Sequence, residues 1–169
     1  MSEITLSAEP GKQEVVITRV FDAPRDLVFK AYTDPALISQ WWGPAMYTIG
    51  VEKLDARPGG SWRIVNRDAE GNEYWFHGVY HDVTPERIVQ TFEWEGMPGH
   101  VSFETVRLED IDGKTRLIAQ SVFQSVEDRD GMLQSMQEEG RGPAEVMDEI
   151  YGRLAELLQR LQKGTARAA

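Results

Sequence analysis

The order of apolar and polar residues changes character early in the chain. Residues 13–22 alternate and are rich in β-branched side chains, which is typical of a half-buried strand. From Arg25 the apolar residues follow a helical spacing, until Asp34-Pro35 ends that helix. The same proline begins a second helix, which we expect to run to Trp41. The N-terminal part therefore predicts one strand followed by two short helices.

After Pro44 the chain returns to short alternating stretches that are separated by turn signals. These signals are clusters of Gly, Pro, Asn and Asp, and Asp112-Gly113 is an example typical of a hairpin. The stretches predict an antiparallel meander with strands at 48–55, 61–67, 73–83, 87–95, 100–110 and 114–124. Together with the first strand, the sequence predicts about seven strands.

The strongest periodic signal follows Gly142-Pro143. Apolar residues recur there at intervals of three and four, which defines a long amphipathic helix. They are Val146, Met147, Ile150, Leu154, Leu157, Leu158 and Leu161. Gly152 costs up to ~1 kcal/mol relative to alanine inside a helix, so it indicates either close backbone packing or space left for another group. Residues 126–142 are charged and indicate a loop with some helix, which is a candidate mobile lid.

The elements combine into a single α+β domain. The 169 residues contain no internal repeat, so we expect one domain over 1–169, with flexible ends at 1–12 and 164–169. A curved antiparallel sheet cannot bury its inner face alone, and the last helix is the long apolar element available to cover it. We therefore expect the sheet to wrap around that helix and to leave a cavity between them.

Charge and composition exclude several classes of partner. A net charge of −10 argues against nucleic acid, because proteins that bind it usually carry a basic patch. No apolar run approaches the ~20 residues of a membrane span, and the N-terminus lacks the pattern of a signal peptide. The absence of cysteine excludes disulfides and thiolate metal sites. We expect a cytoplasmic protein with no nucleic-acid partner and no membrane insertion.

Most of the candidate catalytic and metal-binding patterns have a simpler explanation. His77 and His81 are four residues apart, but their stretch is typical of a strand, where that spacing separates side chains by roughly 13 Å. No serine lies in a strand-turn-helix glycine elbow. Asp82 and Glu104 are candidate general acids, although strand alternation places such residues more often on the solvated face. We expect no metal, no cofactor and no catalytic residue.

Aromatic residues on separate strands favour a binding cavity. Positions of the same parity share one face of a strand, and some polar residues share the parity of the aromatic ones. An apolar wall with a few polar groups is typical of small-molecule pockets. Taken singly, each aromatic residue is more simply explained as a core residue that fills the interior. The other alternative is that the aromatic residues form an exposed patch that binds another protein. The residues that we expect to contact a ligand are Trp42, Trp62, Phe76, Tyr80, Gln90, Phe92, Trp94, Ser121, Met147 and Tyr151.

Two adjacent tryptophans, Trp41 and Trp42, stand directly before the turn at Gly43-Pro44. Two of the largest apolar side chains at a turn predict that the second short helix is wedged against the sheet. We expect one ring to lie in the core and its neighbour at the rim of the cavity.

Several segments carry a family pattern. They are TRVFDAPRDLVFKAYTDPALISQWWGP at 18–44, LDARPGGSWRI at 54–64, FHGVYHDVTPERIVQTFEW at 76–94 and RDGM at 129–132. In this order they resemble the single-domain bacterial relatives of the activator of the ninety-kilodalton heat-shock protein's ATPase. The resemblance implies the SRPBCC superfamily of START lipid-transfer proteins, the birch-pollen allergen and polyketide cyclases, and with it the helix-grip fold. It implies no shared set of catalytic residues.

The function stays open between three classes. The first is a protein that binds a small hydrophobic or amphipathic molecule between the sheet and the last helix, without covalent catalysis. The second is a co-chaperone-like or stress-related module that binds a chaperone or another protein through its acidic surface. The third is an enzyme of the polyketide cyclase or aromatase kind, in which one acid or base assists a bound substrate. The ligand and the oligomeric state do not follow from the sequence.

Overall fold

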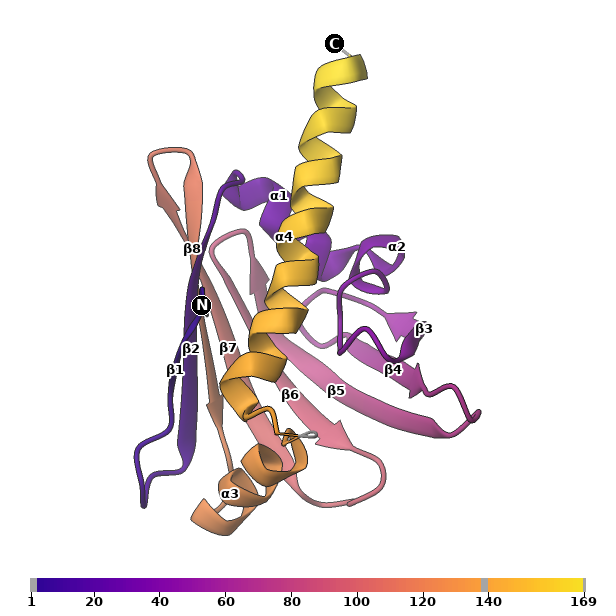
Figure 1. The fold of residues 1–169 in the computed structure, drawn as a ribbon, viewed down its shortest axis with the longest axis vertical. Helices are drawn as coiled ribbons and strands as arrows, with labels where there is room; N and C mark the ends of the chain where they lie inside the picture. The colour runs from indigo at the N-terminus through magenta and orange to yellow at the C-terminus, as the bar shows by residue number, and fades with distance from the viewer. Residues whose placement is uncertain (1–2, 138–139, 169) are drawn as a thin grey trace.

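The computed structural model describes residues 3–137 and 140–168, with side chains as far as residue 164. Figure 1 shows a curved sheet, a long helix in front of it and shorter helices at two ends. The elements in chain order are β1 (Thr5–Ser7), β2 (Glu14–Phe21), α1 (Arg25–Thr33), α2 (Pro35–Ile38), β3 (Thr48–Leu54), β4 (Ser61–Arg67), β5 (Glu73–Thr84), β6 (Arg87–Trp94), β7 (Val101–Ile111), β8 (Lys114–Val122), α3 (Val126–Ser135) and α4 (Pro143–Ala168).

The described strands form one antiparallel sheet of eight strands in the order β1-β2-β8-β7-β6-β5-β4-β3. This confirms the expected α+β class and the sheet that wraps around a C-terminal helix. The prediction of about seven strands was one short, because Thr5–Ser7 pairs with β2. A strand of 3 residues is too short to show alternation in the sequence.

The inner face of the sheet packs on α4. Leu154, Leu157 and Leu158 of this helix are buried, as are Leu108 and Leu117 of the strands. A Cβ atom at Gly152 would meet nothing within 4 Å, so this glycine leaves space and is not required by close packing. None of the helices in the described ranges has the length and apolar character that a membrane span requires.

The ends of the chain carry more regular structure than we expected. Besides β1, α4 continues past Lys163 to Ala168, and its last turns project beyond the sheet in Figure 1. Residues 1–2 and 169 lie outside the described residues. The flexibility of 1–12 and 164–169 stays a prediction.

Helices α1 and α2 lie at one end of the sheet, and α2 ends at Ile38, before the expected Trp41. The next residues form a turn that the side chains of Trp41 and Arg153 hold in place. The Trp41 indole N–H donates a hydrogen bond of 3.0 Å to the carbonyl of Ala31. Arg153 of α4 donates to the carbonyls of Gln40, at 3.2 Å, and of Gly43. These bonds fix the turn between α1 and α4.

Helix α3 covers the opposite end of the sheet (Figure 1) and lies within the segment for which we expected a loop with some helix. The Ser125 side chain caps it by accepting a hydrogen bond from the Asp128 amide at 3.0 Å. Arg129 is buried and donates to the carbonyls of Glu9 at 2.6 Å and Glu14 at 3.4 Å. The helix is therefore tied to the connection between β1 and β2.

Two local irregularities bend the sheet. The register shifts between Tyr80 and Asp82 where β5 meets β6, and between Val51 and Lys53 where β3 meets β4. An extra residue in one strand increases its local bend and twist. The sheet curves around α4 with the help of these bulges.

Candidate functional site

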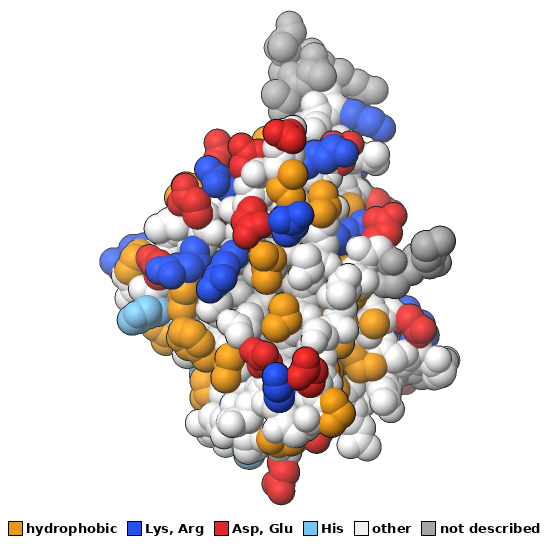
Figure 2. Space-filling model, turned by 90° about the vertical axis from the view of Figure 1, so that its left-hand side faces the viewer, with side chains coloured by type: hydrophobic (Ala, Val, Ile, Leu, Met, Phe, Trp, Pro, Cys, Tyr) orange, Lys and Arg blue, Asp and Glu red, His pale blue; other side chains and the backbone are white. Residues whose placement is uncertain are grey.

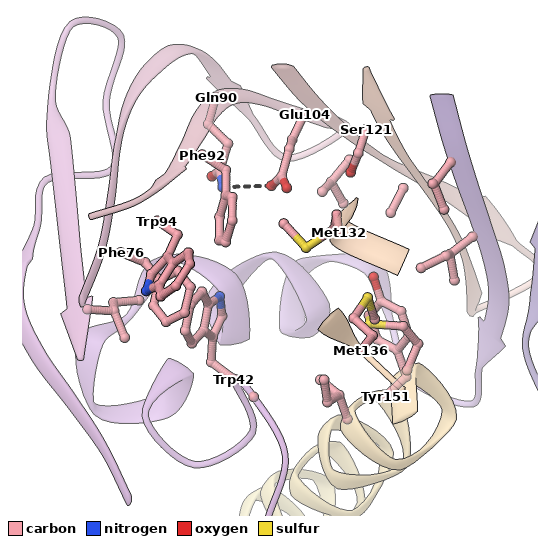
Figure 3. Close-up of a pocket in the computed structure, with 18 of the residues that line it drawn as sticks. Trp42, Phe76, Gln90, Phe92, Trp94, Glu104, Ser121, Met132, Met136 and Tyr151 are labelled. Atoms are coloured by element: carbon pink, nitrogen blue, oxygen red, sulfur yellow. Dashed lines mark hydrogen bonds between the residues drawn. The ribbon is translucent and has the colours of Figure 1, made fainter. Parts of the chain in front are cut away.

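A cavity of about 520 Å³ lies between the sheet, α3 and α4 (Figure 3). Cavities of roughly 300 to 1,000 Å³ accommodate small organic ligands. Well-packed protein interiors contain few voids larger than a water molecule, so this volume is not ordinary packing space. The aromatic residues therefore do not fill the interior.

Every residue that we expected to contact a ligand lines this cavity: Trp42, Trp62, Phe76, Tyr80, Gln90, Phe92, Trp94, Ser121, Met147 and Tyr151. Those on one strand occupy alternate positions, which point to the same face of the sheet. Gln90, Phe92 and Trp94 on β6 are an example. Trp94 is 37% exposed and lies toward the solvent, whereas Trp62 is 3% exposed. Their role in binding stays a prediction.

Four rings form what we call the aromatic wall: Trp42, Trp62, Phe76 and Phe92. The Trp42 ring centroid lies 5.3 Å from that of Phe76 and 6.1 Å from that of Trp62. The rings of Phe76 and Phe92 are also 5.3 Å apart. Figure 3 shows Trp42, Phe76 and Phe92 together on one side of the cavity.

The two adjacent tryptophans have different surroundings. Trp41 is buried, at 3% exposure, and its ring lies 4.8 Å from that of Tyr32 between the centroids. Trp42 is half-buried and belongs to the aromatic wall. Both rings line the cavity, and they differ in burial: Trp41 is a core residue, whereas Trp42 is half-buried in the aromatic wall.

A row of polar side chains crosses the sheet on another side of the cavity (Figure 3). Gln90 on β6 stands opposite Glu104 on β7, and Glu104 stands opposite Ser121 on β8. The Gln90 amide donates to a Glu104 carboxylate oxygen at 3.3 Å, and the Ser121 hydroxyl is a second hydrogen-bond partner of that carboxylate. We call these three residues the polar row.

The environment of Glu104 changes its titration. Burial raises the pKa of Glu104 to about 7, and the hydrogen bonds from Gln90 and Ser121 oppose part of that rise. The side chain keeps some accessible surface because it faces the cavity, and protein atoms surround it on its other sides. The carboxyl group therefore changes from its neutral to its ionised form near neutral pH.

The expectation that Glu104 lies on the solvated face was wrong. Ser102, Val106 and Leu108 share its parity on β7 and are all buried. The alternation of apolar and polar residues along β7 is obscured by Phe103, which is apolar but faces outward and is 47% exposed. Asp82, the other candidate acid, does not line the cavity, and its carboxylate accepts a hydrogen bond of 2.6 Å from Arg87.

Two tyrosines meet at the cavity between α1 and α4. The hydroxyl groups of Tyr32 and Tyr151 are hydrogen-bonded to each other, and both side chains line the cavity. Burial raises the pKa of Tyr151 to about 12 and raises the pKa of Tyr32 well above its ordinary value. Both hydroxyl groups are therefore neutral over the physiological pH range.

Helix α3 contributes side chains that the sequence analysis did not single out. Met132, Leu133 and Met136 all line the cavity, and Figure 3 shows both methionines beside it. Their spacing of four places the two methionines on the same face of the helix. Methionine is a flexible apolar residue that adapts to different ligand shapes.

The ionisable groups of the cavity wall are few. Along the described part of the chain, no Lys, Arg, His or Asp lines it, and Glu104 is the carboxylate present. Two further buried polar atoms of the wall have no hydrogen-bond partner, Trp62 Nε1 and Asn66 Oδ1. Both atoms have less than 1 Å² of accessible surface, so they lie behind the surface that a bound molecule would contact.

The histidines on β5 do not form a metal centre with other side chains. The His77 imidazole lies 3.4 Å from Glu93 and 3.1 Å from Glu95, and Arg63 also pairs with Glu95, at 2.7 Å. Within residues 3–137 and 140–168, no group of three or more candidate ligand side chains is placed to hold a metal ion.

Solved structures of similar shape cover nearly the whole chain. A protein from Rhodobacter sphaeroides is 24% identical with a TM-score of 0.81, and the match covers 94% of this chain and 99% of that one. A protein from Arthrobacter aurescens is 21% identical with a TM-score of 0.82, covering 92% and 91%. Protein Ms6760 from Mycobacterium smegmatis is 21% identical with a TM-score of 0.74, covering 94% and 96%. At such identities the likeness shows the fold alone.

Sequence comparison identifies a family for this chain but no individual curated relative. No curated protein matches this chain. Residues 22–159 match the family model described as "Activator of Hsp90 ATPase homolog 1-like protein".

Proposed function

The chain belongs to the family of Activator of Hsp90 ATPase homolog 1-like proteins, and we propose that it binds one small amphipathic molecule between the sheet and α4, without covalent catalysis. The observation that carries this proposal is the cavity of about 520 Å³ with its mostly apolar wall. Helix-grip domains of this superfamily are small ligand-binding domains, so the cavity and the family support the same function. We propose a cytoplasmic location for this activity.

The composition of the wall supports an amphipathic ligand over a purely apolar one. The aromatic wall provides ring faces for an apolar group, whereas the polar row provides hydrogen-bonding groups on another side of the cavity. Placing an apolar group against Glu104 would leave a buried carboxyl without a full set of partners, which is costly. A molecule with one polar end and one apolar body satisfies both parts of the cavity.

The face drawn in Figure 2 provides less support for a protein-binding module. Figure 2 shows one face on which acidic and basic side chains are intermixed and apolar side chains are scattered. Surfaces that bind other proteins tightly usually gather apolar and aromatic side chains in a continuous patch. Binding to a chaperone or another protein is therefore the alternative outcome of the test below.

A second candidate function is an enzyme of the cyclase kind. The observation that favours it is Glu104, because a carboxyl group with a pKa near neutrality can both donate and accept a proton. Turnover that is lost in Glu104→Gln, with the fold retained, would favour the enzyme over the binding protein.

Native mass spectrometry of the protein, purified gently from the cytoplasmic fraction of its own host, tests the first proposal. We expect an extra mass that is reproducible and is lost on denaturation. Ala119 lines the cavity, so Ala119→Leu should fill part of the space and abolish the extra mass. Ala45 is exposed and outside the cavity, so Ala45→Leu is the matched control and should keep it.

A bare polypeptide mass would contradict the proposal if the melting temperature also stayed constant with fatty acids, aromatics and polyketides. The protein-binding alternative would then be examined by capture from host lysate at low and high salt, because contacts between rim charges are sensitive to salt.

A further inference from the structure

The proposed function leaves the chemical class of the ligand open, and we infer that the ligand is a cationic amine: an aromatic or apolar body against the aromatic wall and an ammonium group on Glu104. This inference rests on the proposed binding function. It follows from the hydrogen bonds, the charge and the spacing of the cavity wall.

The hydrogen bonds of the polar row prepare Glu104 to act as an acceptor. The Gln90 amide donates to it at 3.3 Å from one neighbouring strand, and the Ser121 hydroxyl is its partner on the other. Both contacts favour the ionised carboxylate over the neutral acid. Figure 3 shows the carboxylate extending from β7 toward the cavity, where a ligand can reach it.

The wall supplies donors for this carboxylate but no positive charge. No Lys, Arg or His lines the cavity in the ranges that the structure describes, and no ion pair is found there for Glu104. A buried carboxylate without a counter-charge is unfavourable, which is why burial raises the pKa of Glu104 to about 7. An ammonium group on the ligand would remove this penalty, whereas a ligand carboxylate would add a second negative charge.

The remaining wall fits the body of such a ligand. Phe92 lies two residues from Gln90 on the same face of β6, which separates the two side chains by roughly 7 Å. A short linker between an ammonium group and an aromatic ring spans this distance. The faces of the aromatic wall also attract cations, so they favour rather than oppose the approach of an amine.

The test compares three probes that differ only at one end: phenylbutylamine, phenylbutanol and phenylbutanoate. Binding is followed by NMR of the methionine methyl groups, because Met132, Met136 and Met147 line the cavity. Met46 and Met97 are exposed, at 57% and 49%, and serve as internal controls. At about pH 8 we expect the amine to bind at least about tenfold more tightly than the alcohol, and the carboxylate to bind most weakly.

The variant Glu104→Gln keeps the shape of the side chain and removes its charge. We expect it to lose the preference for the amine over phenylbutanol. A pH series on the unmodified protein gives the same information without a variant. The affinity for the amine should rise about tenfold from pH 6 to pH 8, as Glu104 ionises, and that for the alcohol should stay constant.

The two tyrosines that face Glu104 do not produce this pH response. The remaining titratable side chains are tyrosines, and burial keeps Tyr32 and Tyr151, which face Glu104 from α1 and α4, neutral over that range. The other tyrosines of the wall are Tyr47, Tyr74 and Tyr80.

The outcomes separate the two proposals. If all three probes shift the cavity methionines with equal affinity, the binding function stands and the amine inference is overturned. The same conclusion follows if Glu104→Gln keeps the preference for the amine, or if the affinity does not change with pH. If no probe shifts these methyl groups, the amine inference is overturned, and the native mass measurement decides the binding function separately.

Discussion

At the scale of single residues, Glu104 makes the stability of the protein depend on pH. Its pKa is raised from an ordinary value of 4.5 to about 7 in the folded chain. Between these values the folded chain holds a proton that the unfolded chain has lost. Stability therefore falls as the pH rises through this range, because the folded state binds more protons than the unfolded state.

The variant Glu104→Gln removes this dependence. We expect it to be about as stable as the unmodified protein near pH 4.5 and more stable above pH 7, by up to about 3 kcal/mol in the free energy of unfolding. Urea unfolding at a series of pH values measures the difference. Glu109→Gln changes an exposed carboxyl on the same strand and is the control. Parallel stability curves for Glu104→Gln and the unmodified protein would refute the role given to burial.

The adjacent tryptophans should respond differently to truncation. Trp41→Ala removes a buried ring and its hydrogen bond to Ala31, so we expect a loss of about 3 to 5 kcal/mol in the free energy of unfolding. Trp42→Ala should weaken ligand binding more than stability, because this ring is only half-buried and belongs to the aromatic wall. Thermal unfolding and ligand titration of both variants check the two roles. Similar large losses of melting temperature in both would contradict this division.

Strand alternation was sufficient to find the strand residues of the aromatic wall, since residues of one parity share a face. It failed for Glu104, because the apolar Phe103 beside it lies on the outer face and conceals the pattern of β7. The hydrogen bonds to Glu104 come from neighbouring strands, and strand register is not visible in one sequence. The polar row therefore required the structure.

At the scale of elements, α3 shows why a charged segment was difficult to interpret. The residue that it buries is Arg129 and not an apolar side chain, so its sequence shows no apolar stripe. Its position depends on hydrogen bonds to the carbonyls of Glu9 and Glu14, which are distant in sequence. By contrast, α4 has a regular apolar face, and its sequence was enough to predict it.

Replacing Arg129 should loosen α3 without unfolding the sheet. We expect Arg129→Met to increase amide hydrogen exchange throughout α3 and to speed ligand release, because the helix loses its bonds to the connection between β1 and β2. Hydrogen exchange read by mass spectrometry measures the first effect. Arg116→Met, at an exposed arginine of β8, is the matched control and should leave α3 unchanged. Unchanged exchange in α3 would show that other contacts hold it.

At the scale of the whole molecule, turn signals and the face of α4 together predicted the architecture. The signals set the number of long strands, and the sheet needed the one long apolar helix to cover its inner face. They did not predict β1, whose pairing with β2 depends on a partner strand and not on its own pattern. They also could not give the volume of the cavity, which depends on how the side chains of several elements pack.

The sheet curves around α4 without joining its two outermost strands, β1 and β3, to each other. Outermost strands expose unpaired N–H and C=O groups, on which strands of other molecules can add during aggregation. Here β1 offers only 3 residues. The register of β3 breaks between Val51 and Lys53, and the charged Glu52 and Lys53 stand at the break. Neither edge presents a long, flat template, so the chain can hold a hollow interior at little risk of amyloid-like self-association.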